Sequence, residues 1–477
     1  MSKKIVFISG HFNILHPGHL RLFRFAKTFG DYLIVGVESD KIAKEAAYVK
    51  ENLRMDGVIN NSLVDEVILI NKPIIEIIKK IKPNIIVKGK EHEKQTNPEE
   101  EVLREYGGKL IFTSGETILS SYDFIKKEFQ KSNDESIKLP YEYMKRHKIK
   151  INKLCEIIKN FTKLNIVVIG DLIVDEYITC EPLGMSQEDP TIVVSPVDSK
   201  KFIGGAGIVA AHAAGLGANV KFYTVSGYDE TRKFAVNYLK SIGVKSEIII
   251  DKSRPTTLKQ RYRSKGKSLL RVSHLHQNPI PTEIQKNILL NIKKNKDLIN
   301  LSVFSDFNYG CLPQSIVDDL TSYWNLKGVM QVADCQTSSQ IGDISRYRGM
   351  EFVTPTEHEA RVSLQNREDG LVVLAEKLRS KSNAKNIILK LGEDGILLHS
   401  NNSQSKWVTD RIEALNSNAK DVSGAGDSLL IASAMTRASG GTIWEAALIG
   451  SLAAALQVAR VGNIPLKSEE LLRELQR

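Results

Sequence analysis

One stretch near the end of the chain, NAKDVSGAGDSLLIASA at residues 418–434, constrains the fold more than any other. Gly424, Ala425 and Gly426 directly precede an apolar run, which predicts a loop leading into the N-terminus of a helix. Such small residues let backbone N–H groups approach an anion, and the helix dipole favours the same negative charge. Asp427 would lie in the first turn, where a carboxylate can take a proton from a hydroxyl that attacks a phosphoryl group. The pattern alone leaves open an ordinary helix start with an aspartate cap.

The length and composition of the chain indicate a multidomain globular protein. Its 477 residues exceed one ordinary domain, and its hydrophobic fraction of 42% allows sizeable cores. No run approaches the about 18 apolar residues of a membrane span, and MSKKIVFISG enters a strand without the apolar stretch of a signal peptide. Four widely spaced cysteines argue against a zinc site and against a disulfide framework: Cys155, Cys180, Cys311 and Cys335. We therefore expect a cytoplasmic protein without a membrane partner.

The net charge of +10 admits nucleic acid, an anionic membrane or phosphorylated small molecules as partners. Part of this charge lies in one cluster without acidic residues, which consists of Lys145, Arg146, Lys148, Lys150 and Lys153. No aromatic-interleaved platform or zinc finger accompanies the cluster. We interpret it as a solvated linker or helix face and expect no nucleic acid partner.

Residues 1–115 alternate short β-branched runs with amphipathic segments. This alternation predicts a parallel sheet covered by helices on both faces. Ligands bind such sheets at the carboxyl ends of the strands. Three candidate segments follow predicted strands, at residues 10–19, 88–89 and 119–121.

The H-x-G-H pattern formed by His16 and His19 is the most informative of these segments. Two imidazoles at a helix start can donate hydrogen bonds to phosphate oxygens, and the helix dipole favours the same anion. Nucleotidyl transfer can proceed by such orientation and charge stabilisation alone. A zinc pair is a poor alternative because no third ligand lies nearby in the sequence.

Residues 1–130 resemble the nucleotidyltransferase superfamily defined by G-x-F-D-x-x-H-x-G-H, here GHFNILHPGH, and by a late I-S-S/T-T signature, here ILSS. LIVGVESD and SSYDFIKK look most like the adenylyltransferase half of the bifunctional heptose-phosphate enzymes of lipopolysaccharide synthesis. The resemblance implies that His16 and His19 are catalytic and bind the nucleotide phosphates, and that Arg54 contacts a sugar phosphate. The implied nucleotide site also includes Gly10, Phe12, Lys88, Gly89, Ser120 and Ser121. Asn13 stands where the family usually has Asp.

Residues 131–150 are polar and charged, which predicts a linker before a second domain. In that domain a strand-like run ends at Asp171, and Asp175 follows it. Carboxylates at a strand end suit hydrogen bonds to sugar hydroxyls, although a turn Asp and a surface Asp are the alternative. Gly204 and Gly205 open a small-residue helix that implies close packing or close approach of a ligand.

A predicted β-hairpin at residues 257–271 carries cations at every second position, namely Lys259, Arg261 and Arg263. On a strand these three side chains project from one face, and Arg271 lies on the return strand. The face is either the solvated surface of a lid or a clamp for the distal phosphate of a substrate.

Residues 151–477 resemble the ribokinase-like (PfkB) carbohydrate kinases, with GGAGIVAAHAAGLGA near the start and DVSGAGDSLL near the end, and the heptose-phosphate kinases most of all. The resemblance makes Asp427 the catalytic base. It implies nucleotide and anion binding by Lys390, Gly392, Gly424, Ala425, Gly426 and Glu359. It implies sugar binding by Asp171, Asp175, Gly204, Gly205, Lys259, Arg261 and Asp306. The family's N-x-x-E, which helps to organise Mg²⁺, reads Thr356-x-x-Glu359 here, so we expect Mg²⁺ near Glu359 through water and no directly ligating side chain.

These features predict an α/β protein with a Rossmann-like nucleotidyltransferase domain (1–130), a linker (131–150) and a ribokinase-like domain with a small β lid (151–477). The predicted activities are the ATP- and Mg²⁺-dependent phosphorylation of a sugar, such as heptose 7-phosphate at O1, and adenylyl transfer to a sugar 1-phosphate that releases pyrophosphate and gives an ADP-sugar such as ADP-heptose. The heptose enzymes usually carry the kinase first, so the domain order here is reversed.

The resemblance also leads us to expect a monovalent cation in the kinase and a homodimer formed through the kinase lid. Two alternatives remain. One is a CTP-dependent cytidylyltransferase fused to a different sugar kinase. The other is a non-catalytic regulator that binds nucleotides or RNA.

Overall fold

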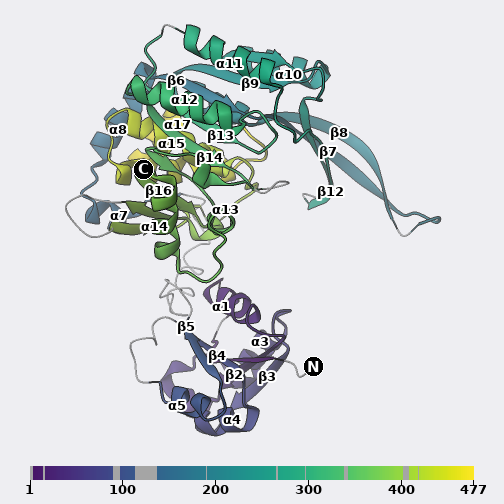
Figure 1. Cartoon of the computed structure of the whole chain (residues 1–477). Coiled ribbons are helices and arrows are strands. Elements are labelled where there is room, and N and C mark those ends of the chain that lie inside the picture. Colours follow the sequence, from purple (N-terminus) through teal and green to yellow (C-terminus); the bar gives the residue numbers. More distant parts are fainter. Residues whose placement is uncertain are drawn as a thin grey trace. The chain divides into compact units, whose positions relative to one another are not determined.

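The computed structural model describes residues 4–13, 15, 17–89, 97–112, 137–189, 191–264, 267–295, 297–337, 342–400, 408–416 and 418–477. The chain divides into two compact units, residues 1–134 and 135–477. Each unit contains its own sheet with helices packed on it (Figure 1).

The N-terminal unit is built on five parallel strands in the order β3-β2-β1-β4-β5. The strands are β1 (Ile5–Gly10), β2 (Tyr32–Glu38), β3 (Glu66–Ile70), β4 (Ile85–Lys88) and β5 (Lys109–Phe112). The described helices are α1 (Pro17–Lys27), α2 (Asp40–Ala43), η1 (Lys44–Ala46), α3 (Glu51–Ile59), α4 (Ile74–Ile81) and α5 (Glu99–Arg104). The strand order reverses between β1 and β4, and ligands bind open α/β sheets at such a switch point.

Both faces of this sheet are buried, as uninterrupted apolar strands predict. Successive residues of β1 point to opposite faces. Ile8 packs with Phe23 of α1 on one face, and Phe7 packs with Ile78 of α4 on the other. The Rossmann-like α/β fold that the sequence predicts for this part of the chain is confirmed.

The C-terminal unit contains a nine-stranded sheet in the order β10-β9-β6-β13-β14-β15-β16-β17-β18. Neighbouring strands from β10 to β16 are parallel, and β17 and β18 add antiparallel pairs at one edge. The strands are β6 (Asn165–Gly170), β9 (Asn219–Ser226), β10 (Lys245–Ile250), β13 (Leu301–Asp306), β14 (Met330–Cys335), β15 (Phe352–Val353), β16 (Asn386–Lys390), β17 (Ile396–Ser400) and β18 (Val408–Ile412).

Helices cover both faces of the large sheet. One layer holds α7 (Tyr141–Arg146), α8 (Ile151–Lys159), α9 (Ala206–Gly215), α10 (Glu230–Ser241), α15 (Ala425–Ala438), α16 (Ile443–Val458) and α17 (Ser468–Gln476). The other holds α11 (Thr282–Lys294), α12 (Gln314–Leu326), α13 (Glu357–Leu364) and α14 (Leu371–Ser382). Short 3-10 turns complete the unit: η3 (Asn160–Lys163), η4 (Ile344–Arg346) and η5 (Gly392–Asp394).

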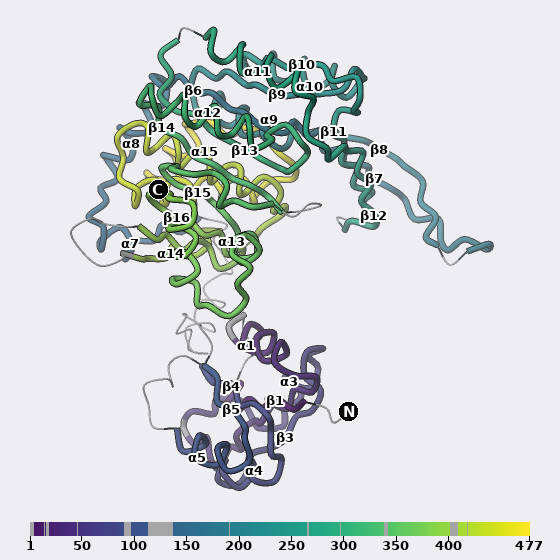
Figure 2. Tube along the Cα trace, viewed as in Figure 1, coloured from purple at the N-terminus to yellow at the C-terminus, as the bar shows by residue number. Residues whose placement is uncertain are grey.

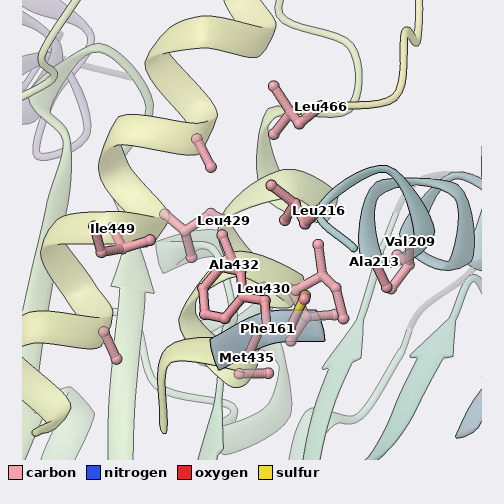
Figure 3. Packing of buried hydrophobic residues seen from close by; sticks show 14 of the residues in the cluster. Phe161, Val209, Ala213, Leu216, Leu429, Leu430, Ala432, Met435, Ile449 and Leu466 are labelled. Atoms are coloured by element: carbon pink, nitrogen blue, oxygen red, sulfur yellow. The ribbon is translucent and has the colours of Figure 1, made fainter. Parts of the chain in front are cut away.

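Small side chains let α15 pack closely against its neighbours (Figure 3). Leu430 and Ala432 of α15 share a core with Ala213 of α9, and all three are fully buried. A Cβ added at Gly450 of α16 would collide with the hydroxyl of Ser433 in α15, so the glycine permits the contact. This packing holds the beginning of α15 in place.

A second sheet, in the order β12-β11-β7-β8, forms the lid. Its strands are β7 (Leu172–Met185), β8 (Ile192–Gly205), β11 (Thr257–Ser264) and β12 (Lys267–His274). The predicted hairpin at 257–271 is therefore present as β11 and β12. In Figures 1 and 2, β7 and β8 continue side by side beyond the other two strands as a long arm. The predicted ribokinase-like fold with a small β lid is confirmed.

The expected linker at 131–150 does not hold for residues 139–149, which belong to the core of the C-terminal unit. Tyr143 and Met144 of α7 are buried there. The Tyr143 hydroxyl donates to the Trp444 carbonyl over 3.0 Å, and the His147 ring stacks on the Trp444 ring at 3.9 Å between centroids. The charged residues between these apolar positions lie on the exposed face of a docked helix, which is why the segment reads as a linker. Lys145 and its basic neighbours are solvent-exposed, as predicted.

Candidate functional site

Asp427 lies in the first turn of α15, which begins at Ala425, and its side chain is buried. Gly424 is the N-cap with a φ of 76°, in the left-handed region that favours glycine. Oδ1 of Asp427 has no hydrogen-bond partner within the described part of the chain. A buried carboxylate that has an unbonded oxygen and lies beside the N–H groups of a helix start is suited to phosphoryl transfer onto a hydroxyl.

Burial is the main reason that the pKa of Asp427 is raised to about 7. The nearby carboxylates of Asp334 and Asp175 raise this pKa further, and the cations of Lys390 and Lys259 lower it. Asp427 therefore titrates near neutral pH, where a general base is effective.

Lys390 ends β16 and forms an ion pair with Asp334 near the end of β14. Its Nζ lies 2.8 Å from Oδ1 and 3.0 Å from Oδ2 of Asp334. A Cβ added at Gly426 would stand 3.2 Å from the same Nζ, so the glycine leaves room for the lysine. Burial lowers the pKa of Lys390, but Asp334 and Glu359 outweigh it and the net pKa is raised. Lys390 is thus a fixed cation at the beginning of α15.

Gly392 begins η5, two residues after Lys390, with a φ of 63°. A Cβ added there would meet nothing within 4 Å. The backbone conformation rather than packing therefore favours glycine. The open space beside it is compatible with the expected nucleotide contact.

The Thr356-x-x-Glu359 sequence forms a capping box at the beginning of α13. Oε2 of Glu359 accepts the Thr356 N–H at 2.6 Å, and Oε1 accepts the Thr337 N–H at 3.0 Å. Both oxygens of Glu359 therefore already hold the backbone. The departure from N-x-x-E preserves a helix cap, because Thr is also a good N-cap residue.

Asp171, a predicted sugar contact, holds a loop with its carboxylate. The backbone N–H groups of Phe307, Tyr309 and Cys311 donate to it at 2.8, 3.2 and 3.1 Å. Burial, followed by the nearby Asp306, raises the pKa of Asp171. The sequence shows that this carboxylate follows a strand but not which N–H groups reach it.

Asp306, also a predicted sugar contact, has several partners within the protein. Its Oδ2 accepts hydrogen bonds from Arg346 Nη2 at 2.5 Å and from the Tyr347 hydroxyl at 2.8 Å, and the Cys335 thiol lies 3.3 Å away. The side chain is almost wholly buried. Together with Asp171 it supports the segment that follows β13.

Asp175 retains the position expected of a sugar contact. It is buried on β7 and lies 3.5 Å from Arg261 Nη2. Burial raises its pKa, although Arg261 and Lys259 lower it. A Cβ at Gly204 would collide with Oδ2 of Asp175, and Gly205 has a φ of 58° as the N-cap of α9. The two glycines let this carboxylate approach the beginning of α9.

The cations of the lid share one face of its sheet. Lys259 pairs in register with Asp175, Arg261 pairs with Tyr177 on β7, and Arg271 lies directly opposite Arg261 on β12. Lys259 Nζ lies 5.1 Å from the centre of the Tyr309 ring, which adds a cation–π contact. Arg263 lies over the Tyr177 ring at 5.0 Å. The basic face therefore has aromatic and carboxylate support, and its net charge is positive.

Sequence reasoning missed three residues of this region: Asp334, which acts on the pKa of Asp427, and the bonded pair Tyr177 and Asp421. Asp421 is the first residue of DVSGAGDS and accepts a hydrogen bond from the Tyr177 hydroxyl at 2.8 Å. Asp334 could have been found in the sequence, because it lies near the end of a strand, as Asp306 does. Nothing in the sequence marks Tyr177, because its partner lies 244 positions away.

In the N-terminal unit, Phe12 positions His19. Gly10 ends β1, and Phe12 follows it with a φ of 48° and a buried ring. The Phe12 ring meets the His19 ring edge-on at 5.0 Å between centroids. His19 therefore lies beside the carboxyl end of β1, as predicted. The expected site residues His16, Ser120 and Ser121 lie outside the described residues.

Lys88 ends β4, directly before Gly89, at the carboxyl edge of the same sheet. Its Nζ donates to Oε1 of Glu99 at 2.7 Å and to Oδ1 of Asn97 at 3.0 Å. Glu99 is buried. Lys88 is thus held by an acidic partner at the expected nucleotide site.

Arg54, a predicted phosphate contact, has a fully buried side chain that holds the strand ends together. Its Nη1 donates to the carbonyls of His11 and Glu38 at 2.7 and 2.8 Å, its Nε donates to the Val49 carbonyl at 2.7 Å, and its Nη2 pairs with Asp40 at 2.6 Å. The sequence predicts a basic residue near the site, but it does not show that backbone carbonyls surround its side chain.

Asn13, where the resembling family has Asp, uses both ends of its amide. Nδ2 donates to the Ala46 carbonyl at 2.7 Å, and Oδ1 accepts the N–H groups of Tyr48 and Val49 at 2.8 and 3.3 Å. A carboxylate could not donate to Ala46. The substitution therefore suits the loop that the side chain holds.

Two searches of the described residues gave negative results. They contain no group of three or more His, Cys, Asp or Glu side chains that could hold a metal ion. No helix among them is long and apolar enough to cross a membrane.

Comparison with protein families identifies the class. Residues 163–470 match the pfkB family carbohydrate kinases, and residues 7–130 match the cytidylyltransferase-like family. Because the first match spans more than half of the chain, this chain belongs to the pfkB family of carbohydrate kinases.

Curated relatives include two proteins named bifunctional protein HldE. The one from Desulfatibacillum aliphaticivorans is 29% identical over 321 residues, which cover 66% of this chain and 64% of that protein. The one from Helicobacter hepaticus is 30% identical over 317 residues, which cover 65% of this chain and 63% of that protein. The chain therefore spans less than two thirds of the length of these relatives.

Solved structures share the kinase fold at low sequence identity. Phosphofructokinase-2 from Escherichia coli in complex with substrates and products has a TM-score of 0.53 and 14% identity, with 66% of this chain and 98% of that chain covered. Ribokinase from Arabidopsis thaliana complexed with ribose and ATP has a TM-score of 0.51 and 18% identity, with coverage of 66% and 99%.

Proposed function

We propose that the chain is a bifunctional enzyme of nucleotide-activated sugar synthesis, acting in the cytoplasm. Its nucleotidyltransferase domain would occupy residues 1–130, and its sugar kinase domain would extend from α7 to the end of α17. The resemblance to heptose-phosphate enzymes and the relatives named HldE support heptose 7-phosphate as the kinase substrate. The four buried, unpaired cysteines suit a reducing compartment.

The observation that carries the kinase proposal is the unpartnered Oδ1 of Asp427, buried at the beginning of α15. The sugar hydroxyl would attack the γ-phosphorus of ATP and pass its proton to this oxygen, and ADP would leave. The N–H groups at the start of α15, together with Lys390, would stabilise the charge on the transferring phosphoryl group. The basic lid face around Arg261 would hold the distal phosphate of the sugar.

Mg²⁺ would accompany ATP and neutralise charge on its phosphates. Both carboxylate oxygens of Glu359 bind backbone N–H groups, and Asp334 is paired with Lys390. These residues fit a metal that is held through water near Glu359, with no direct side-chain ligand. A monovalent cation also belongs to the proposal, because the buried amide oxygens of Asn463 and Gln457 have no partner within the described residues. Such oxygens are ligands that K⁺ accepts.

In the N-terminal domain, His19 and His16 would donate hydrogen bonds to the phosphates of ATP. A phosphate oxygen of the sugar 1-phosphate would attack the α-phosphorus, and pyrophosphate would leave, giving an ADP-sugar. The position of His19 at the carboxyl end of β1 supports this assignment.

One assay tests both activities. The purified chain would receive heptose 7-phosphate or heptose 1-phosphate with ATP or CTP, and the products would be followed by ³¹P NMR. We expect ADP and a bisphosphate in the first case, and pyrophosphate from ATP in the second. Asp427→Asn should remove only the first reaction, and His19→Ala only the second. Pyrophosphate from CTP instead would favour a cytidylyltransferase, and no reaction with any pair would favour the regulator.

The lid arm supports a homodimer. Its exposed side chains include Leu183, Met185, Ile192 and Val197, with exposures of 66%, 61%, 58% and 67%. A second copy of the arm would cover this apolar surface. Leu183→Asp should turn a dimer into a monomer in light scattering after size exclusion, whereas a monomeric wild-type chain would rule the dimer out.

A further inference from the structure

Tyr177 connects the lid sheet to the loop in front of α15. Its hydroxyl donates to Oδ2 of Asp421 at 2.8 Å and lies 3.1 Å from Oγ of Ser423. Asp421 also accepts the N–H groups of Ser423 and Gly462, both at 3.0 Å. The phenol is therefore bonded to the carboxylate that organises the segment leading to Gly424.

The ring of the same tyrosine supports the basic face of the lid. Arg261 and Arg263 lie over it at 5.3 and 5.0 Å from the ring centre, and Arg261 is its partner in the register of β11 with β7. Phe202 packs against it at 5.1 Å between centroids. Tyr177 is buried, so each contact fixes its orientation for the others.

The hydroxyl and the ring thus act on different parts of the site. The bonds of the hydroxyl hold the residues directly before the beginning of α15, which in the proposed kinase would face the transferring phosphoryl group. The ring contacts Arg261 and Arg263, which in the proposed kinase would face the sugar phosphate. A bond to a carboxylate is stronger than a neutral one, so Asp421 is the acceptor that fixes the phenol.

We propose that Tyr177 is a positioning residue that couples the placement of the lid cations to the shape of the anion-binding loop at 421–424. This inference rests on the proposed kinase function. The aromatic ring sets the affinity for the phosphorylated sugar. The hydroxyl sets the rate of phosphoryl transfer, because it fixes the loop whose N–H groups stabilise the transition state.

The test separates the two parts of the side chain. Tyr177→Phe keeps the ring, so kcat for ADP formation should fall tenfold or more while KM for the phosphorylated sugar stays within twofold. Tyr177→Leu removes the ring as well, so that KM should also rise tenfold or more. Tyr262→Phe is the matched control, because Tyr262 is one position from Arg261 on β11 and faces the opposite side of the sheet. It should leave both constants unchanged.

Two further measurements keep the test decisive. Ser423→Ala removes the second hydroxyl of the link and leaves Tyr177 in place, so it should lower kcat without changing KM. Hydrogen exchange without substrate should show faster exchange of the Ser423 and Gly462 N–H groups in Tyr177→Phe than in Tyr262→Phe.

The inference is overturned if Tyr177→Phe keeps the kcat of the wild type, if kcat and KM change together in that variant, or if the exchange rates are unchanged. An inactive wild-type chain would instead overturn the proposed function. Hydrogen exchange would then still show whether Tyr177 holds the loop, because it needs no substrate.

Discussion

The ammonium of Lys390 lies 2.8 Å from Oδ1 of Asp334, and the two residues act on the pKa of Asp427 in opposite directions. Asp334→Asn removes a charge that raises this pKa, so the acid limb of the pH profile of kcat/KM should move to lower pH. Lys390→Met removes a charge that lowers it, so the limb should move to higher pH. Shifts of both variants in the same direction would contradict this electrostatic account.

Asp427→Asn should abolish ADP formation, because the amide cannot take the proton. Loss of a general base typically lowers the rate by about 10²- to 10⁴-fold. A variant that retained more than about a hundredth of the wild-type kcat would rule out the base assignment.

The same variant should also change the pH dependence of stability. The pKa of Asp427 is raised to about 7 in the folded protein, and an unfolded Asp titrates near about 3.9. Between these values the folded state keeps a proton that the unfolded state releases, so the free energy of unfolding falls by up to about 1.4 kcal/mol per pH unit as pH rises. Above pH 7 the loss is complete.

The asparagine of the Asp427→Asn variant cannot ionise, so this variant does not lose this free energy of unfolding as pH rises. Its melting temperature should therefore exceed that of the wild type at pH 8, and the difference should shrink towards pH 4. Asp319→Asn, on the exposed side of α12, is the control and should show no such trend. If the wild type and Asp427→Asn had equal melting temperatures at pH 8, the pKa of Asp427 would not be raised in the folded protein.

Lys259→Ala and Arg261→Ala should each raise KM for the phosphorylated sugar tenfold or more and leave KM for ATP unchanged. The reason is that both cations lie on the lid face that also carries Asp175. Lys245→Ala, on the edge strand β10, is the control. Steady-state kinetics with the phosphorylated and unphosphorylated sugar would check this. A wild-type chain without preference between the two sugars would mean that the basic face is only surface.

Arg54→Met should destabilise the N-terminal domain rather than only weaken substrate binding. The variant leaves the His11 and Glu38 carbonyls without their donor, and unsatisfied buried groups each cost about 1–3 kcal/mol. In the full chain, the thermal unfolding transition of the N-terminal domain should therefore occur at a lower temperature than in the wild type. Arg104→Met, on an exposed helix position, should leave it unchanged. If the unfolding transition stayed at the wild-type temperature while KM for the sugar 1-phosphate rose, Arg54 would instead act as a phosphate contact.

Local sequence patterns were sufficient for the fold and for the centre of the candidate site. Apolar strand-length runs that alternate with amphipathic segments determine a parallel α/β arrangement, because each strand must be covered on both faces. The helix start at Gly424 is likewise local, since Gly permits the left-handed turn and the apolar run after Asp427 continues the helix. The basic face of the lid follows from the period of two along β11.

Only the tertiary structure decided which polar side chains remain available to a ligand. Asp171, Asp306 and Arg54 stand where ligand-binding residues stand, but chain segments distant in sequence occupy their hydrogen-bonding groups. Asp427 differs from them because no such segment reaches its Oδ1 within the described residues. The sequence by itself determined the residue types at the strand ends and the layers that hold them. Their pairing, and the link from Tyr177 to Asp421, depended on contacts that form only when the sheets, lid and helices pack together.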